Sequence, residues 1–366
     1  MKSTITRREM IKAAGALALA PAALAAAQKA SWPSAEIGAP KICLGIRPDL
    51  DAAGMRRVKQ LGVDYVLTGG PPIPWTEDVL RERMNRFKAG GLTICNMMIG
   101  GFPKTLYGKP GRDEEIEKVK QSLRAAGKAG LPVVEYNFYA HRIVEGYYEE
   151  LGRAGAGLTA FDYDRVKDLP PLPDIGAHTL DEMWANATYF LKAIIPVAEQ
   201  AGVRMALHPN DPPAPISRGS GQIMSTLAGW KRLVDIVKSP ANGITFDCGV
   251  TRKLGEDPVA VARYFGARDC INHVHYRNVI MRKPYEKYTE VFIDEGQVDM
   301  FAVMKELVRR KYTRGLYPEH PRALDYDRER EGGIVGLYAR VGGGGFGGEI
   351  YNVGYTKAML QAALAR

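Results

Sequence analysis

The sequence has few of the features that mark small stapled domains, membrane proteins or nucleic-acid-binding proteins. Its 366 residues include four cysteines, widely spaced and without a CxxC pair, which excludes a disulfide framework and a zinc ribbon. Past residue 30, no apolar run approaches the roughly 20 residues that span a bilayer, and no Lys/Arg block singles out nucleic acid. A chain of this length buries about three-quarters of its unfolded surface on folding and needs no disulfide or metal for that purpose.

The composition is that of an ordinary globular protein. Hydrophobic residues make up 46% and charged residues 25% of the chain, which excludes disorder and fibrous folds. The formal net charge is +9, and part of it is concentrated in the first 27 residues. The rest gives a mildly cationic surface, which suits an anionic substrate as well as nucleic acid.

The amino-terminal segment has the pattern of an export signal. Arg7 and Arg8 precede an apolar run over 13–24, which three alanines follow at 25–27. A charged start, a short apolar centre and an A-x-A site are typical of a secretory signal, and the arginine pair resembles a twin-arginine signal. A membrane-anchoring helix is the alternative, but the run is short and a proline interrupts it. We therefore expect a signal peptide over 1–27, a linker over 28–40 and a periplasmic protein.

The remaining chain alternates short strand-like runs with longer helical patterns. Strands are predicted at 42–45, 65–67, 92–98, 133–137, 204–208, 244–247, 271–275 and 315–318. Helices are predicted at 52–61, 76–89, 113–129, 180–201, 223–237, 258–265, 298–310 and 351–364. Eight such pairs predict a single (β/α)8 barrel over 41–366. An open doubly wound sheet is the alternative, but no G-x-G-x-x-G follows the first strand.

Barrels place their chemistry at the carboxyl ends of the strands, and here these ends carry metal-binding side chains. On the fifth to eighth strands they are His208, Asp247 or Cys248, His275, Glu319 and His320. One histidine alone is more often a packing residue, but residues at four successive strand ends would converge above the barrel. The pattern predicts a site for Mn²⁺, Fe²⁺, Zn²⁺ or a related divalent ion. Adjacent residues point to opposite faces, so only one of Asp247 and Cys248 is an expected ligand.

Three other features bear on this site. His273 shares a strand face with His275 but lies deeper, so we expect it to pack behind the ligands. The segment 138–178, rich in tyrosine and glycine, is too long for an ordinary connection and is expected to cover the site. The glycines at 342–348 lack the lysine spacing of a phosphate-binding loop and indicate a mobile loop.

Several motifs resemble those of the mannonate dehydratase family, in order from about residue 42 to the carboxyl terminus. They are Y-N-F at 136–138, H-P-N-D-P-P at 208–213, V-H-Y-R-N-V at 274–279, G-Q-V-D-M at 296–300, Y-P-E-H at 317–320 and G-Y-T-K-A at 354–358. The resemblance implies a xylose-isomerase-like barrel that removes water from D-mannonate to give 2-keto-3-deoxygluconate. It also implies a divalent ion, commonly Mn²⁺, with Fe²⁺ and Mg²⁺ as alternatives.

The resemblance assigns roles to individual residues. It makes His208 and His275 metal ligands and His320 an acid or base, and it puts Glu319 where the family usually has an aspartate. On the sixth strand the family has a ligand cysteine. Ungapped pairing places Asp247 there, whereas a shift of one residue would bring in Cys248.

The sequence also departs from the family pattern. An aspartate in place of the cysteine ligand favours Mn²⁺ or Mg²⁺ over softer metals. Asn210 replaces the first aspartate of the usual H-P-D-D-P-P. A catalytic tyrosine found in some members has no secure counterpart, and Tyr326 and Tyr338 are candidates.

The chemistry of dehydration explains why these residue types are needed. The proton beside a carboxylate is weakly acidic, so a cation must stabilise the enediolate that forms when it leaves. An imidazole such as His320 suits either proton transfer near neutral pH. We expect Arg277 to pair with the substrate carboxylate. Tyr136 and Asn137 are expected to hold hydroxyls, and Asn278 completes the predicted substrate-binding set.

Two other functions would use the same features. An isomerase or epimerase on this barrel would stabilise the same enediolate with the same metal and return the proton elsewhere. An exported carbohydrate-binding protein would keep the pocket without turnover. Export argues somewhat against the dehydratase, because sugar-acid catabolism is expected in the cytoplasm. The expected partner is a small sugar acid rather than nucleic acid or a membrane, and the sequence leaves the oligomeric state open, a homo-oligomer included.

Overall fold

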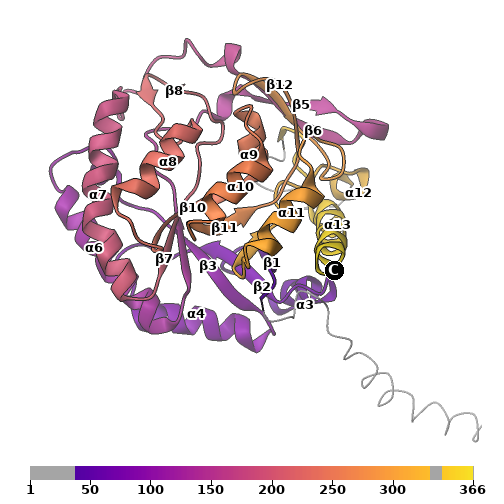
Figure 1. The fold of residues 1–366 in the computed structure, drawn as a ribbon, viewed down its shortest axis with the longest axis horizontal. Helices are drawn as coiled ribbons and strands as arrows, with labels where there is room; N and C mark the ends of the chain where they lie inside the picture. Colours follow the sequence, from indigo (N-terminus) through magenta and orange to yellow (C-terminus); the bar gives the residue numbers. More distant parts are fainter. Residues whose placement is uncertain (1–37, 330–339, 366) are drawn as a thin grey trace, which may run out of the picture.

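The structure is a computed structural model that describes residues 38–329 and 340–365 (Figure 1). The expected signal peptide over 1–27, most of the expected linker and the candidate Tyr338 lie outside these ranges. Within them, no helix combines the length and the apolar character needed to cross a membrane.

Eight parallel strands close into a barrel (Figure 1). In chain order they are β1 (Lys41–Gly45), β2 (Tyr65–Gly69), β3 (Thr93–Ile99), β4 (Val133–Tyr136), β7 (Arg204–Leu207), β10 (Asn242–Asp247), β11 (Ile271–His275) and β14 (Gly315–Tyr317). Each pairs with the next, and β14 pairs with β1 to close the ring. The predicted barrel is confirmed, and the open sheet is excluded.

Helices surround the barrel between successive strands (Figure 1). They are α3 (Ala52–Gln60), α4 (Glu77–Ala89), α5 (Pro103–Leu106), α6 (Arg112–Ala129), α7 (Leu180–Gln200), α8 (Leu227–Ile236), α9 (Cys248–Lys253), α10 (Pro258–Gly266), α11 (Met300–Arg309), α12 (Asp325–Arg328) and α13 (Phe346–Leu364). Side-chain caps determine where several begin. For example, α8 starts four residues later than predicted, because the Thr226 side chain accepts a hydrogen bond from the Gly229 backbone.

The last helix begins earlier than its sequence pattern predicts. Its first turn contains Gly347 and Gly348, whose backbone N–H groups donate to the Asp327 carboxylate at 2.7 and 3.1 Å. This cap from a distant residue satisfies two donors that a helix leaves unpaired at its start. The glycine-rich loop expected over 342–348 is therefore helical from Phe346 onward.

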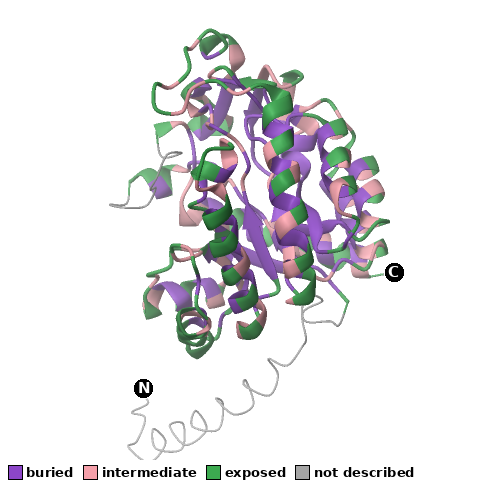
Figure 2. Ribbon diagram, turned by 90° about the vertical axis from the view of Figure 1, so that its left-hand side faces the viewer, coloured by how far each residue is buried: buried purple, intermediate pink, exposed green. Residues whose placement is uncertain are grey.

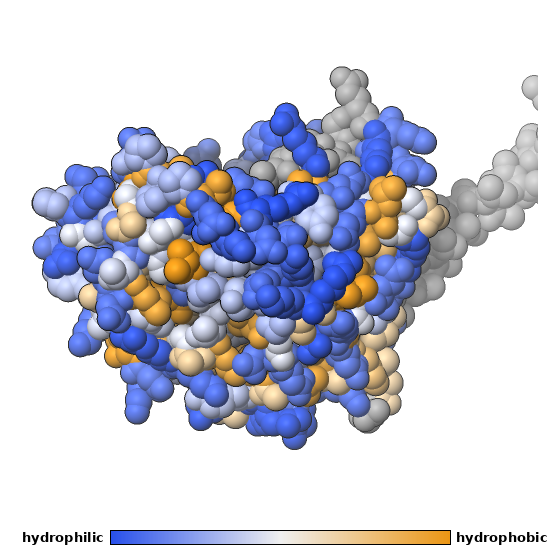
Figure 3. Space-filling view, turned by 90° about the horizontal axis from the view of Figure 1, so that it is seen from above, coloured by the Kyte–Doolittle hydropathy of each residue, from blue (hydrophilic) through white to orange (hydrophobic). Residues whose placement is uncertain are grey.

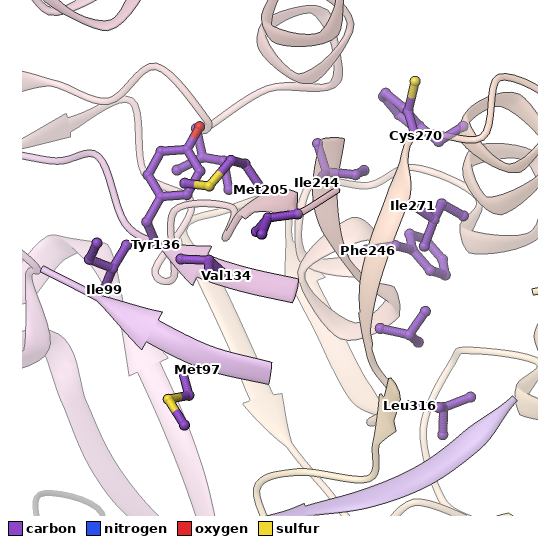
Figure 4. Packing of buried hydrophobic residues seen from close by; sticks show 14 of the residues in the cluster. Met97, Ile99, Val134, Tyr136, Met205, Ile244, Phe246, Cys270, Ile271 and Leu316 are labelled. Atoms are coloured by element: carbon purple, nitrogen blue, oxygen red, sulfur yellow. The ribbon is translucent and has the colours of Figure 1, made fainter. Parts of the chain in front are cut away.

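The core lies between the strands and the inner faces of the helices. Figure 2 shows the strands almost wholly buried and the helices exposed along their outer faces. Figure 4 shows part of this core, where Met97, Val134, Met205 and Phe246 pack among other apolar residues. Apolar burial of this extent is the main contribution to stability that holds the strand ends in fixed positions.

A small antiparallel sheet lies beside one end of the barrel (Figure 1). Its strands are β5 (Tyr147–Leu151), β6 (Gly157–Asp162), β12 (Val279–Lys283) and β13 (Lys287–Glu290), in the order β12-β13-β6-β5. Two come from the long 138–178 segment and two from a hairpin after β11 that the sequence pattern did not predict. The short pieces around it are η2 (Val144–Gly146), η3 (Arg153–Gly155), η4 (Tyr163–Arg165), β8 (Ile216–Ser217) and β9 (Ser220–Gly221).

The sheet has its own apolar cluster, which includes Tyr147, Phe161 and Tyr288. The ring of Phe161 stacks on Tyr288 with centroids 5.2 Å apart, and it makes an edge contact with Tyr147 at 5.3 Å. Seen from above, the molecule presents mostly hydrophilic side chains, with hydrophobic residues in small scattered groups (Figure 3). The sheet therefore covers this end of the barrel without exposing a large apolar face.

Candidate metal centre

Four potential metal ligands meet at the carboxyl ends of adjacent barrel strands. His208, Asp247, His275 and Glu319 follow or end β7, β10, β11 and β14, and one ligand atom from each lies within 4.8 Å of the others. Nδ1 of His275 is 3.0 Å from Nε2 of His208 and 3.0 Å from Oε1 of Glu319. Two imidazoles and two carboxylates so close together form a plausible set for a divalent ion.

The protonation of the two histidines differs, because their surroundings differ. Burial lowers the pKa of His208 to about 4, so this imidazole is neutral, which is the form that binds a metal. Burial also opposes the charged form of His275, but the carboxylates of Glu319 and Glu135 outweigh it and raise its pKa to about 9. Nδ1 of His208 lies 2.7 Å from the Pro209 carbonyl, which leaves Nε2 directed at the cluster.

Glu319 provides the strongest sign that a cation fits here. Burial opposes its ionisation, but His275, His320 and Arg277 together hold its pKa well below the usual range. Its buried Oε1 lies 2.8 Å from Nε of Arg277 and 3.0 Å from Nδ1 of His275, but makes no well-aligned hydrogen bond with a described residue. A buried charge is costly unless it is well compensated, and a divalent cation held by the cluster would give this oxygen a direct ligand bond.

On the sixth strand the structure places Asp247, rather than Cys248, in the cluster. Oδ1 of Asp247 accepts from the Val250 backbone at 2.7 Å, which caps α9. The Cys248 sulfur points away, 3.4 Å from the His275 carbonyl and 3.2 Å from that of Arg277. Burial raises the pKa of this thiol, which disfavours the thiolate that a metal would need.

Arg277 lies on the buried side of the cluster and does not face the adjacent cavity. Its side chain is 3% exposed and its guanidinium contacts four carboxylates, those of Asp211 (2.7 Å), Asp247 (2.5 Å), Glu290 (2.6 Å) and Glu319 (2.8 Å). It is absent from the described residues that line the adjacent cavity. The structure thus gives Arg277 protein partners in place of the substrate carboxylate that the sequence analysis expects.

Lys253 extends this buried network. Its side chain is fully buried, and Nζ lies 2.7 Å from Asp211 and 2.8 Å from Glu290. Paired charges with several hydrogen bonds each are the condition under which burial is tolerated. Lys253 and Arg277 together hold the acidic side chains in one arrangement around the candidate centre.

A cavity of about 140 Å³ opens in front of the candidate ligands. It is lined by Met98, Asn137, Tyr139, Arg142, His208, Pro209, Asp211, His275, Glu319 and His320. His320 has a left-handed backbone conformation, with φ of 51°, which is uncommon for a residue other than glycine. Its Nδ1 lies 2.7 Å from Oε2 of Glu290, and its Nε2 lies 3.5 Å from Oε2 of Glu319.

The predicted substrate-binding residues are not all at this cavity. Asn137 lines it. Tyr136 is buried in the core instead (Figure 4). Its ring meets the edge of Phe190, and burial raises its pKa. The Asn278 amide is also buried, and it donates a hydrogen bond to the Ile293 carbonyl at 3.0 Å, in the loop that precedes α11. Tyr326 is 50% exposed on α12 and does not line the cavity.

Several cavity residues were missed by sequence reasoning, Tyr139 and Arg142 among them. Tyr139 and Arg142 belong to the covering segment, which carries no recognisable motif. Arg142 Nε donates to the Asp211 carbonyl at 2.7 Å. Glu290, the partner of His320, was also missed, because it ends a strand that pairs with β12 beside it in the sequence and with β6 more than a hundred residues away.

Comparisons with known proteins identify the family. A profile described as D-mannonate dehydratase (UxuA) matches residues 174–352. A mannonate dehydratase of Streptococcus equi subsp. zooepidemicus (strain MGCS10565) is 31% identical over 348 residues, which cover 86% of this chain and 93% of that protein. This chain belongs to the mannonate dehydratase family. The predicted resemblance is therefore confirmed.

Other members and solved structures agree. A mannonate dehydratase of Thermotoga petrophila is 32% identical over 334 residues, covering 79% of this chain and 91% of that protein. The crystal structure of mannonate dehydratase from Streptococcus suis serotype 2 superposes with a TM-score of 0.78 at 28% identity, covering 89% and 95% of the two chains. A D-psicose 3-epimerase from Clostridium cellulolyticum H10 has a TM-score of 0.52 at 12% identity, covering 89% and 97%, and shares the fold alone.

Proposed function

We propose that this protein is a metal-dependent mannonate dehydratase, a hydro-lyase that converts D-mannonate to 2-keto-3-deoxy-D-gluconate and water. The observation that carries the proposal is the cluster of His208, Asp247, His275 and Glu319. Three of these ligands, His208, His275 and Glu319, line a cavity together with His320. Membership of the mannonate dehydratase family supports dehydration over the isomerase reaction that the same barrel could host.

The four clustered residues would hold one divalent cation. Their nitrogen and oxygen donors suit Mn²⁺, Fe²⁺ or Mg²⁺, and the absence of a thiolate from the cluster makes softer ions less suitable. When bound, the cation would stabilise the negative charge that develops on the substrate carboxylate as the adjacent proton leaves.

His320 would exchange a proton with the substrate. Nδ1 of His320 lies 2.7 Å from the Glu290 carboxylate and 3.0 Å from the Arg277 guanidinium, and Nε2 lies 3.5 Å from Glu319. An imidazole in this position could take the proton beside the carboxylate or protonate the departing hydroxyl. Asn137 would hold a substrate hydroxyl, and the Arg142 guanidinium would add positive charge that suits an anionic sugar acid.

A product assay tests the proposal. Purified protein, stripped of metal and reloaded with Mn²⁺, is incubated with D-mannonate and a panel of aldonates and ketoses. We expect a 2-keto-3-deoxy acid to form only with metal, and to be lost in His320→Asn. Tyr326→Phe, at an exposed position outside the cavity, is the matched control and should retain activity.

The alternatives give different products. Interconversion of sugars without loss of water would identify an isomerase or epimerase. Binding of a sugar acid without turnover, in folded and metal-loaded protein, would identify a carbohydrate-binding protein and overturn the dehydratase.

We also propose that the protein is exported through a twin-arginine signal at its amino terminus. Substitution of both Arg7 and Arg8 by lysine should leave the protein in the cytoplasm of the producing cell. Fractionation of periplasm and cytoplasm measures this, and an unchanged distribution would contradict the proposal.

A further inference from the structure

A second group of metal-binding side chains lies deeper in the barrel, behind the candidate centre. Glu135, His273 and His275 each offer a ligand atom within 4.8 Å of the others, and all three are buried. Glu135 is on β4 and is only 1% exposed. A carboxylate in the lumen of a barrel costs free energy unless its surroundings compensate it, and no step of the proposed reaction uses it.

Neutral donors on two neighbouring strands fix the position of Glu135. Oε1 accepts from the Thr245 hydroxyl on β10 at 2.7 Å, and Oε2 accepts from the Asn96 amide on β3 at 2.8 Å. Both bonds orient the carboxylate without neutralising its charge. Its Oε1 lies 3.6 Å from Nε2 of His275, which has no hydrogen-bond partner among the described residues.

The packing of His275 determines which nitrogen faces which group. Its Nδ1 is directed at the other candidate ligands, 3.0 Å from Glu319. Its ring stands nearly perpendicular to His273 and Tyr317, with interplanar angles of 85° and 86°. These two rings hold the imidazole so that Nε2 points toward Glu135.

We propose that Glu135 is a positioning residue that accepts the Nε2–H of His275 and so fixes the tautomer whose Nδ1 binds the cation. The role rests on the metal centre proposed above. A neutral imidazole carries one proton, and a carboxylate beside Nε2 keeps the proton there and leaves the Nδ1 lone pair for the metal. A small tilt of the ring would bring the two atoms from 3.6 Å into hydrogen-bond range.

A second cation between Glu135, His273 and His275 is the competing explanation of this group. Both oxygens of Glu135 already accept hydrogen bonds, and in the tautomer proposed for the metal-loaded protein Nε2 of His275 carries a proton. The positioning role uses the groups as they are arranged, whereas a second cation needs Nε2 to lose its proton while Nδ1 binds the first.

The test compares Glu135→Gln with Glu115→Gln. Glu115 is also a buried carboxylate, but it hydrogen-bonds Thr105 away from the centre. Mn²⁺ affinity is measured by calorimetry or by competition with a chelator, and the number of bound ions by elemental analysis. We expect about 10- to 100-fold weaker binding for Glu135→Gln, unchanged binding for Glu115→Gln, and one ion per chain. Ring ¹⁵N spectra of Mg²⁺-loaded wild type should show His275 protonated at Nε2.

Other results would overturn the role. Equal Mn²⁺ affinity in both variants, a second ion lost from Glu135→Gln, or a His275 protonated at Nδ1 each contradicts it. If the wild-type protein binds no cation, the metal centre itself is wrong, and the role of Glu135 falls with it. The wild-type measurement shows this before any variant is compared. If Glu135→Gln does not fold, Thr245→Val is the second variant, because it removes one hydrogen-bond donor to Glu135. We expect it to weaken Mn²⁺ binding by about three- to tenfold. Unchanged Mn²⁺ affinity in Thr245→Val would contradict the proposal.

Discussion

At the scale of single residues, Arg277 determines how the acidic side chains around the candidate centre are arranged. One planar guanidinium contacts Asp211, Asp247, Glu290 and Glu319 at 2.5–2.8 Å. A forked group with donors on several edges can do this, whereas an ammonium concentrates its donors at one point. The sequence shows an arginine at a strand end, but it does not show that four carboxylates converge on it.

Replacing Arg277 by lysine should therefore destabilise the protein although the charge is retained. Buried carboxylates left without a partner cost about 3–5 kcal/mol when a buried pair is broken, and the lysine would restore only part of this. Urea unfolding measures the change. Arg309→Lys is the control, because this side chain is 59% exposed where it pairs with Glu306, and it should change stability by less than about 0.5 kcal/mol. Equal losses in the two variants would contradict the central role of Arg277.

At the scale of elements, the barrel could be predicted and the covering sheet could not. Each barrel strand is a short apolar run bounded by helices and glycine, so local pattern and spacing predict it. The candidate ligands followed from the same reasoning, because their positions depend only on where strands end. The covering sheet instead pairs β13 with β6, so that Glu290 faces Thr159. Pairing across this distance is decided by tertiary packing, which leaves no local signal for Glu290 or Arg142.

The covering segment also leads to a prediction about substrate binding. Arg142 lines the cavity and is held by the Asp211 carbonyl, so its guanidinium can meet an anionic substrate. Loss of a hydrogen bond to a charged group costs about 1.5–3 kcal/mol. Arg142→Ala should therefore raise KM for D-mannonate by about 10- to 100-fold, with a smaller effect on kcat.

Steady-state kinetics of Mn²⁺-loaded protein measure this split. Arg153→Ala is the control, because Arg153 belongs to the same covering segment but pairs with Asp294 and does not line the cavity. If KM is unchanged in Arg142→Ala, or changes equally in both variants, Arg142 does not bind the substrate.

At the scale of the whole molecule, the carboxyl-terminal helix α13 links the barrel to the segment that follows Glu319. Asn352 donates to the Glu319 carbonyl at 3.2 Å, and Asp327 caps the start of the helix through Gly347 and Gly348. Glu349 lies in the same first turn. Burial, together with the nearby charge of Asp327, raises its pKa to about 7.

This raised pKa makes stability depend on pH in a definite direction. The ordinary glutamate value is 4.5, so between pH 4.5 and 7 the folded protein keeps a proton that the unfolded chain releases. The contribution of Glu349 is therefore fully present below about pH 4.5 and is lost as the pH rises through 7. Glu349→Gln, which cannot ionise, should match wild type near pH 4.5 and exceed it by about 2–3 kcal/mol at pH 8. Urea unfolding across this range measures the difference. The control is Glu199→Gln, on the exposed face of α7, whose free energy of unfolding should follow that of wild type at every pH. If the difference between Glu349→Gln and wild type does not change with pH, the Glu349 carboxyl ionises as freely in the folded protein as in the unfolded chain.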